Sequence, residues 1–370
     1  MPFLSTRSPI VRRFFKNKLA PWALVYIFFI LLISFFAYPL SPDDSQDANT
    51  IVLEIAAKAP GFQCDFLKLP HTSQEAPKQS FFHYLLFGKT QVSIWIPIHS
   101  VTRVNDSLHI QKWIDDELSE DLHLALNHYS EDYITYANWK EALVVRKTYW
   151  LGTDRYGRDM LSRLLLGSRV SLSVGIIAVL LSISIGVLLG ALAGYFGGLI
   201  DLAISWLIQV VWAIPTLLLV FAITFVMGKG FWQIFIAVGL TMWVGTARLI
   251  RGQVLTLREM DYVKAAQVMG YSHTRIILKH ILPNIVGPTM VLAAGNFATA
   301  ILIEAGLSFL GIGVQPPVSS WGLMIKENYN FIITNRPLLA IIPGVAIMLI
   351  VLAFNIVGNA LRDAVDVRGE

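Results

Sequence analysis

The sequence predicts an all-α polytopic membrane protein with six transmembrane helices and a small extracytoplasmic α+β insert between the first and second helices. Of its 370 residues, 55% are hydrophobic and only 15% are charged, a composition too apolar for an ordinary soluble domain. Several apolar runs reach the roughly 20 residues that a helix needs to cross a bilayer. Charge is also segregated: residues 1–20 hold five basic and no acidic residues, whereas residues 41–165 hold 12 basic and 17 acidic ones.

The first apolar run, residues 22–40, follows the basic N-terminus and superficially resembles a signal peptide. It is long enough to span a bilayer, and Tyr38-Pro39-Leu40 is a poor small-residue cleavage site. We therefore expect an uncleaved first span. Its basic N-terminal flank should stay in the cytoplasm, because positive charges are retained on that side.

Residues 41–150 are expected to form the insert, outside the cytoplasm. Alternating hydrophobicity at 91–98 predicts a short strand with an edge-type proline, and 108–125 and 136–145 are interpreted as amphipathic helices. Cys64 is the only cysteine, which excludes an intramolecular disulfide and a cysteine-based metal site. Because no two histidines of the insert have the i,i+4 spacing that would place both on one helix face, we predict no metal site.

The segment LGTDRYGRD, residues 151–159, precedes the second span. One interpretation is a capped turn, with Thr153 or Asp154 capping a helix that starts near Gly157. The other is a rigid outer lip against which a partner protein rests. The composition alone leaves both open.

The second span, about 170–195, carries small residues four positions apart, which places them on one helix face and allows two backbones to approach closely. Packing within the chain is favoured over a seam with a second subunit. In the third span, about 202–227, Pro215 predicts a kink near Val211. The packing residues are Ser182, Gly186, Gly190 and Gly194, and the remaining spans are about 231–250, 285–311 and 338–358.

Four polar or aromatic residues inside the spans are candidates for a substrate pathway: Gln209, Trp212, Asn296 and Glu304. A carboxylate within a span is costly unless it faces a water-filled cavity or a partner. Glu304 is therefore either functional or, near the outer end, solvated or structural. After the fifth span, residues 319–322 are expected to form an outer re-entrant or interfacial element, with Trp321 at headgroup depth.

A polar, basic segment at 258–283 interrupts the apolar half of the chain. On a helix, Ala265 and Met269 are i,i+4 neighbours, and so are Ala266 and Gly270. Small side chains there would let the surface of another protein approach, which favours a docking helix over a catalytic site. The predicted docking residues are Lys264, Ala265, Ala266, Met269 and Gly270.

The same residues carry a family resemblance. Ala-Ala, three residues, Gly and a run ending in Leu-Pro resemble the cytoplasmic EAA loop of permease subunits from ABC importers. Together with LGTDRYGRD, ALAGYFGG, EAGLSFLGIGVQPP and SSWG, this loop resembles the C-type permease of dipeptide, oligopeptide and nickel importers over residues 151–366. Lys264 departs from the pattern, which has a glutamate there, and the insert is longer than is usual.

The resemblance implies half of a translocation pore in a bacterial inner membrane, with both termini cytoplasmic. Its organisation would be 1–40, the N-terminus and first span; 41–150, the insert; and 151–370, the permease core with a coupling loop at about 256–283. The implied partners are a second homologous permease, two ATPase subunits that engage the 264–271 coupling helix, and an extracytoplasmic solute-binding protein. ATP-Mg would be bound by the partner ATPases, and this chain would bind no cofactor.

The chain carries none of the motifs G-x-x-x-x-G-K-[ST], G-x-S-x-G or H-E-x-x-H, so we predict a transport subunit rather than an enzyme. One alternative is a secondary transporter driven by an ion gradient, which would need paired intramembrane acids or broken helices in repeated halves. Another is a membrane scaffold whose active part is the 41–150 region.

Overall fold

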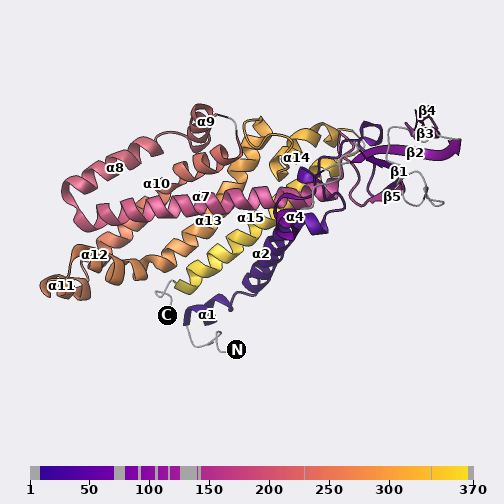
Figure 1. Cartoon of the computed structure of the whole chain (residues 1–370). Helices are drawn as coiled ribbons and strands as arrows, with labels where there is room; N and C mark the ends of the chain where they lie inside the picture. The colour runs from indigo at the N-terminus through magenta and orange to yellow at the C-terminus, as the bar shows by residue number, and fades with distance from the viewer. Residues whose placement is uncertain are drawn as a thin grey trace. The chain divides into compact units, whose positions relative to one another are not determined.

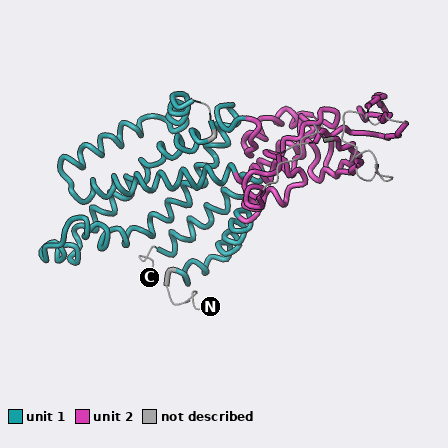
Figure 2. Tube along the Cα trace, viewed as in Figure 1, with its two compact units in different colours: residues 1–31, 170–315, 345–370 teal, residues 32–169, 316–344 magenta. Residues whose placement is uncertain are grey.

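The computed structural model describes residues 9–70, 80–90, 93–104, 107–115, 117–125, 140, 143–228, 230–334 and 336–365. The chain divides into two compact units, each discontinuous in sequence (Figure 2). Unit 1 comprises 1–31, 170–315 and 345–370, and unit 2 comprises 32–169 and 316–344. The expected insert at 41–150 thus lies within a larger unit that also takes in a segment from near the C-terminus.

Long apolar helices build unit 1 (Figure 1). Among the described residues, four helices are long and apolar enough to cross a membrane, or five if a bent pair counts as one more. Two of the four, α7 and α15, begin in unit 2 and end in unit 1. The four are α7 (Met160–Phe196), α10 (Phe231–Arg258), α13 (Leu282–Leu310) and α15 (Leu338–Val365).

The bent pair is α8 (Gly198–Trp212) and α9 (Thr216–Met227), whose axes differ by 93°. The helix breaks one residue after the position where a kink was predicted, and the bend is much sharper than a kink. Pro215 is the cause, because it lacks a backbone donor and disfavours helical geometry in the residue before it. The break separates two short helices within one apolar segment.

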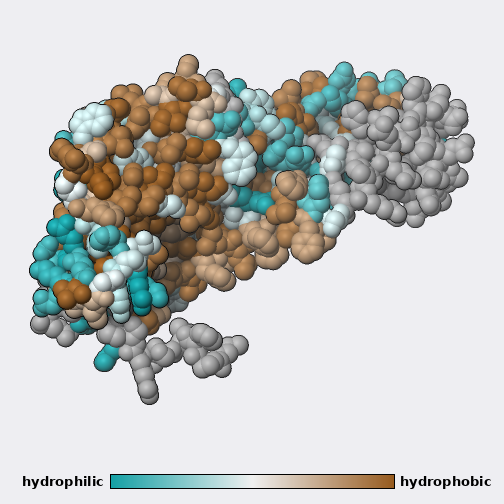
Figure 3. All heavy atoms as spheres, turned by 60° about the vertical axis from the view of Figure 1, so that its left-hand side comes forward, coloured by the Kyte–Doolittle hydropathy of each residue, from teal (hydrophilic) through white to brown (hydrophobic). Residues whose placement is uncertain are grey.

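The N-terminal helices are shorter: α1 spans Pro9–Phe14 and α2 spans Ala20–Phe35, an apolar helix of 16 residues. Apolar side chains cover much of the surface seen in Figure 3. On the helices of unit 1, Leu199 is 83% exposed and Val226 is 89% exposed. Such a surface is stable only in an apolar medium or against a partner, as expected of lipid-facing helices.

Unit 2 contains a five-stranded antiparallel sheet, in the order β4-β3-β2-β1-β5. Residues alternate between two cores, with Leu67 and Leu69 of β1 in one and Cys64 and Phe66 in the other. The strands are β1 (Phe62–Pro70), β2 (Ser93–Val104), β3 (Ser107–Trp113), β4 (Ser119–Ala125) and β5 (Val144–Tyr149). The short helices are α3 (Ala37–Leu40), η1 (Gln46–Ala48), η2 (Leu53–Ile55), α4 (Phe81–Phe87), α14 (Trp321–Asn328) and η5 (Tyr329–Ile332).

The helix predicted at 108–125 is wrong, because this segment forms strands β3 and β4. Leu108 and Ile110 are both buried, and a spacing of two places them on one face of the sheet. Most of the helix predicted at 136–145 lies outside the described residues, and its last two residues belong to β5.

The strand predicted at 91–98 corresponds to the start of β2, although residues 91 and 92 lie outside the described residues. β2 is a central strand, not an edge strand. Pro97 is nevertheless tolerated because the ladder between β2 and β3 begins at Ile98, so that Pro97 pairs only with Phe66 of β1.

The turn at 151–159 is capped differently from the prediction. Helix α7 begins at Met160, and the backbone N–H of Ser162 donates to Asp159 Oδ2 at 2.8 Å. Asp154 does not cap α7, because its Oδ1 accepts from the backbone N–H groups of Tyr156 and Arg158 inside the turn, at 2.8 and 3.0 Å.

Trp321 is not at the surface as expected of a headgroup anchor. It is only 2% exposed, and its indole N–H donates to the carbonyl of Leu164 at 3.0 Å. Ser320 caps α14, its Oγ accepting from the backbone N–H of Leu323 at 3.2 Å. The SSWG segment therefore fastens α14 to the first turns of α7 inside unit 2.

Three short elements lie beyond the ends of α10 and α13 in unit 1 (Figure 1). They are α11 (Asp261–Val268), α12 (His273–Ile276) and the π-helical turn η4 (Ile277–Ile281), which leads into α13. They cover the segment predicted to dock onto a partner.

Candidate functional site

A cavity of about 250 Å³ lies in unit 1, where the break between α8 and α9 faces α10 and α13. It exists because the helix stops at Trp212 and restarts at Thr216, so that the two arms leave space beside α10. Every lining residue is uncharged, and the polar or aromatic ones are Trp212, Thr216, Thr241, Asn296 and Thr299.

The amide of Asn296 is held at the cavity wall by two hydroxyl groups. Its Nδ2 donates to Ser182 Oγ at 3.2 Å and to Thr246 Oγ1 at 3.3 Å, and these two hydroxyls share a hydrogen bond of 2.9 Å. The three side chains come from α7, α10 and α13. This triad fixes the orientation of the amide, which is what a recognition site for a polar solute requires.

The threonine hydroxyls of the cavity donate to their own helices: Thr241 Oγ1 to the carbonyl of Val238 at 2.8 Å, and Thr299 Oγ1 to that of Gly295 at 2.9 Å. Their oxygen lone pairs are then available as acceptors for a bound molecule. Near the cavity, the guanidinium carbon of Arg248 lies 3.7 Å from the ring centroid of Trp212. This cation–π contact orients the indole and brings a positive charge close to the cavity.

Of the four predicted pathway residues, the structure brings Trp212 and Asn296 together and separates the other two. Gln209 is exposed and does not line the cavity. Glu304 is fully buried, and its carboxylate accepts from Ser308 at 2.7 Å and from Ser171 at 3.3 Å. It therefore joins α13 to α7 rather than facing a solute.

Sequence reasoning missed the threonines of the cavity. Thr241 and Thr299 fall inside predicted spans, where a hydroxyl is a modest polar signal that could have been noticed. Thr216 also falls inside a predicted span, but its position beside the other two depends on the bend that follows Trp212.

The small-residue ladder of α7 packs against α10 within this chain. A Cβ added at Gly186 would lie 2.4 Å from Thr246 Cβ, and one at Gly190 would lie 2.5 Å from the carbonyl oxygen of Ala247. At Gly194 the distance to the carbonyl oxygen of Arg251 would be 2.8 Å. With Ser182 bound to Thr246, the ladder sets the spacing of the two helices that hold Asn296.

In the predicted docking helix, α11, Ala266 does not face outward. It is 1% exposed and packs with Val263 in a core formed by α7, α10, α11 and the start of α13. The small side chain serves close packing inside the chain. The outward face consists of Lys264, Ala265, Val268 (89% exposed) and Met269 (63% exposed).

Gly270 ends α11 with φ +76°, a left-handed conformation that glycine adopts at little cost. The N–H of Tyr271 then donates to the carbonyl of Ala266 at 3.1 Å. Lys264 Nζ lies 3.2 Å from Glu259 Oε2. Hydrogen bonds from Lys264 and Arg258 hold the pKa of Glu259 below its usual range.

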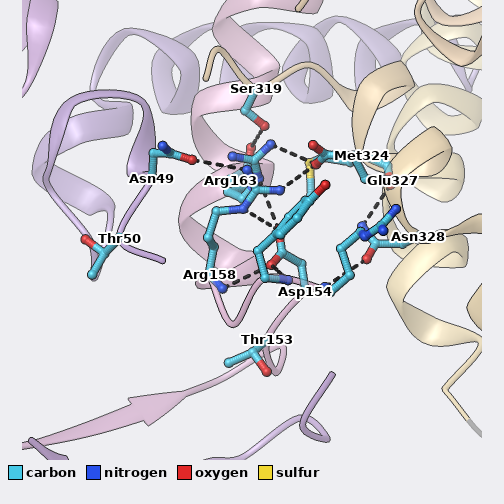
Figure 4. Close-up of polar contacts among 12 residues, drawn as sticks. Asn49, Thr50, Thr153, Asp154, Arg158, Arg163, Ser319, Met324, Glu327 and Asn328 are labelled. Carbon is cyan, nitrogen blue, oxygen red and sulfur yellow. Dashed lines mark hydrogen bonds and ion pairs between the residues drawn. The ribbon is translucent and has the colours of Figure 1, made fainter. Parts of the chain in front are cut away.

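Unit 2 contains a buried network of four charged side chains: Asp154, Arg158, Arg163 and Glu327 (Figure 4). Arg158 donates to Asp154 at 2.7 Å and to Glu327 at 2.6 Å, and Arg163 donates to the same Glu327 oxygen at 3.2 Å. Two positive and two negative groups balance, as a buried network requires. It ties the 151–159 turn to α14.

The chain is similar to known transport proteins. Residues 186–368 match the binding-protein-dependent transport system inner membrane component, and residues 8–60 match the N-terminal TM domain of oligopeptide transport permease C. It is 42% identical over 218 residues to a dipeptide transport system permease protein of Alkalihalophilus pseudofirmus, covering 59% of this chain and 71% of the relative.

A glutathione transport system permease protein of Pectobacterium atrosepticum is 40% identical over 237 residues, covering 64% of this chain and 78% of the relative. A nickel transport system permease protein of Escherichia coli is 38% identical over 218 residues, 59% of this chain and 78% of the relative. Among solved structures, an inward-facing MetNI methionine ABC transporter chain matches with 19% identity and a TM-score of 0.43, over 55% of this chain and 97% of that one.

Proposed function

The chain belongs to the inner-membrane permease subunits of binding-protein-dependent ABC importers, and on that premise we propose that it forms half of a translocation pore for peptides or similar small solutes. The observation that carries this proposal is the uncharged cavity with the fixed amide of Asn296. Amide and hydroxyl groups match the hydrogen-bonding groups of a peptide backbone. An aromatic ring beside them provides apolar contact area.

We infer six spans, counting α2, α7, the bent pair α8–α9, α10, α13 and α15. An even number places both termini on one side, and the basic residues before α2 favour the cytoplasmic side. The loop with α11 and α12 then lies in the cytoplasm, and the sheet of unit 2 lies outside it. The inferred location is the bacterial inner membrane.

The proposed partners are a second homologous permease, two ATPase subunits that bind ATP-Mg, and an extracytoplasmic solute-binding protein. The outward face of α11 is proposed as the contact with an ATPase subunit, because exposed Val268 and Met269 present apolar surface beyond the spans. Gly270 contributes the turn that ends this helix rather than a contact surface.

The core under α11 supports a mechanical role for this contact. It includes Tyr195 of α7, Ile250 and Val254 of α10, and Ile285 of α13. Tyr195 also binds His273 through its hydroxyl at 2.9 Å, and its carbonyl accepts from Arg258 at 3.1 Å. A displacement of α11 is therefore passed to three spans together, as a rigid-body switch of access to the pore requires.

The experiment is uptake of a labelled dipeptide into proteoliposomes that contain the complete complex, with its ATPase subunits and binding protein. We expect ATP-dependent uptake in the wild type and loss of uptake in Thr299→Trp, which fills the cavity. The matched control is Leu302→Trp on the same helix, since Leu302 is 51% exposed and lies outside the cavity. Uptake driven by an ion gradient without ATPase subunits, or full uptake in Thr299→Trp, would overturn the proposal.

A further inference from the structure

A second cavity, of about 300 Å³, lies in unit 2 beside strand β5. Residues 146–150 line it in unbroken succession. Successive side chains of a strand point to opposite faces, so a cavity that touches five residues in a row runs along the edge of the strand. In the described sheet β5 pairs with β1 alone, so that its other edge is open to an added strand.

Two buried carboxylates stand on the wall of this cavity, Asp43 and Asp159, which are 7% and 5% exposed. Asp159 Oδ2 accepts from the N–H and hydroxyl of Ser162. Asp159 Oδ1 is buried and has no hydrogen-bond partner among the described residues. A buried acceptor without a donor is costly, so this oxygen is where an incoming donor gains most.

Of the two basic side chains of the cavity, Arg146 is engaged with Asp65, whereas Lys147 contacts an aromatic ring and also acts on the charges of Asp43 and Asp159. Arg146 donates to Asp65 at 2.8 and 3.2 Å, and Lys147 Nζ lies 3.6 Å from the ring centroid of Trp95. Burial raises the pKa of Asp159, and the neighbouring charge of Asp43 raises it further, against the lowering effects of Ser162 and Lys147. The Oδ1 of Asp159, unpartnered among the described residues and beside Asp43, is therefore the place in the cavity where an added cation would favour the ionised carboxylate.

We propose that this cavity binds the free ammonium end of a short peptide in an extended conformation. The ammonium group donates to Asp159 Oδ1 beside Asp43, and the peptide backbone lies along the open edge of β5, as strands added to sheets do. A cavity of about 300 Å³ is at the small end of the roughly 300–1,000 Å³ of ligand pockets. A peptide of about two residues suits that size.

A metal ion fits this cavity less well, because the described residues contain no group of three or more His, Cys, Asp or Glu side chains that could hold one. An ammonium group needs fewer ligands and forms charge-assisted hydrogen bonds with carboxylates. The choice of a peptide rests on the proposed function, in which peptides or similar solutes reach this face of the membrane.

The test uses the purified full chain in nanodiscs without ATP, with isothermal titration calorimetry as the readout. Dialanine is the probe, and N-acetyl-dialanine is the counterpart that lacks the ammonium charge and keeps the terminal carboxylate. We expect dialanine to bind and N-acetylation to weaken binding roughly ten-fold or more, the scale of a lost charge-assisted hydrogen bond. Asp159→Asn should weaken dialanine binding equally. The matched control Asp121→Asn, on exposed β4 and away from the cavity, should not.

If Asp159→Asn fails to fold, the comparison between dialanine and its acetylated form still decides. The inference is overturned by equal binding of the two peptides, by wild-type affinity in a folded Asp159→Asn variant, or by no binding to the folded wild type.

This experiment separates the two proposals. Absence of dialanine binding to the chain alone, with ATP-dependent uptake intact in the full complex, removes the peptide site of unit 2 and leaves the transport proposal standing. Binding at Asp159 without ATP-dependent uptake removes the transport proposal and keeps the site.

Discussion

Arg163 and Glu327 lie 164 positions apart in the sequence, and Arg163 Nη2 donates to Glu327 Oε2 at 3.2 Å in the interior of unit 2. Arg163 is fully buried, and its Nε and Nη1 have no hydrogen-bond partner among the described residues, although Nε lies 3.6 Å from Asp154 Oδ2. The guanidinium therefore depends on these two carboxylates for charge compensation. This dependence joins the turn before α7 to α14.

Glu327→Gln is expected to destabilise unit 2 strongly. It removes one negative charge from the network, so that Arg158 and Arg163 share the remaining network carboxylate, Asp154, while Asp47 acts on Arg163 from farther away. Breaking a buried pair by removing one partner costs about 3–5 kcal/mol. The melting temperature of the purified chain in nanodiscs measures the effect.

The control is Asp115→Asn, because Asp115 is 68% exposed in its ion pair with Lys58, and exposed pairs contribute about 0–1 kcal/mol. Equal melting temperatures for Glu327→Gln and the wild type would contradict this account.

Gly190→Ala is expected to impair folding or assembly, because the new methyl group would lie 2.5 Å from the carbonyl oxygen of Ala247 and 2.9 Å from Ile250 Cβ. Backbone cannot yield as a flexible side chain does, so α7 and α10 must separate. Gly252→Ala is the matched control within α10, since a Cβ there meets nothing within 4 Å. That control should be neutral or stabilising, given that alanine favours helix over glycine by about 1 kcal/mol. Similar yields and melting temperatures for both variants would show that the close approach of α7 and α10 at Gly190 does not affect stability.

Four of the predicted spans, or five with the bent pair, correspond to helices long and apolar enough to cross a membrane among the described residues, because the length of an apolar run fixes what can cross a bilayer. Trp212 and Asn296, which the sequence singled out as unusual inside a span, line the cavity of unit 1. Gln209 was predicted to face the pathway, but it does not line the cavity. Its helix ends three residues later at a break of 93°, and helical periodicity does not predict such a break. Ala266 was assigned outward because a small residue is equally suited to contact a partner and its own chain.

The interior of unit 2 was harder to predict because its contacts are distant in sequence. The buried network joins Arg158 to Glu327 across 169 positions, and no local pattern predicts that pairing. Strands β3 and β4 were taken for a helix since short apolar runs fit either period. The antiparallel pairing of β3 with β4 determines that both segments are strands. His109, for example, pairs with His123.

Lys264→Glu is expected to weaken recruitment of the proposed ATPase subunit. The substitution places a second carboxylate beside Glu259, whose pKa is now held low by its hydrogen bond to Lys264. The outward face of α11 would become locally acidic, whereas the native lysine favours an acidic partner surface. Co-purification of the ATPase subunits at low and high salt measures the effect, with Lys264→Met as the control that removes the charge without reversing it. We expect the order wild type, Met, Glu, with differences that shrink at high salt. Equal co-purification of all three would show that this charge has no part in docking.

Asp159→Asn should change the pH dependence of stability in the absence of peptide. Burial raises the pKa of Asp159 in the folded chain above its unfolded value of about 3.9. The folded state therefore binds the proton more tightly, so this group favours folding at low pH and loses that contribution as the pH rises through the folded pKa. Asparagine carries no charge to desolvate. The melting temperature of the variant minus that of the wild type should thus increase from acidic to neutral pH.

Melting curves of both proteins between about pH 4.5 and 8 measure this difference. Carboxylates far from Asp159 contribute alike to both curves and cancel in the difference. Asp43 and Lys147 interact with Asp159 and are present in both proteins. Asp121→Asn provides the flat reference, because Asp121 is exposed on β4. Saturating dialanine should reduce the pH dependence, since the bound ammonium group stabilises the ionised carboxylate. A difference that stays constant with pH would mean that Asp159 is solvated in the folded protein, and the cavity beside β5 would then lack the unpaired acceptor on which its proposed ligand depends.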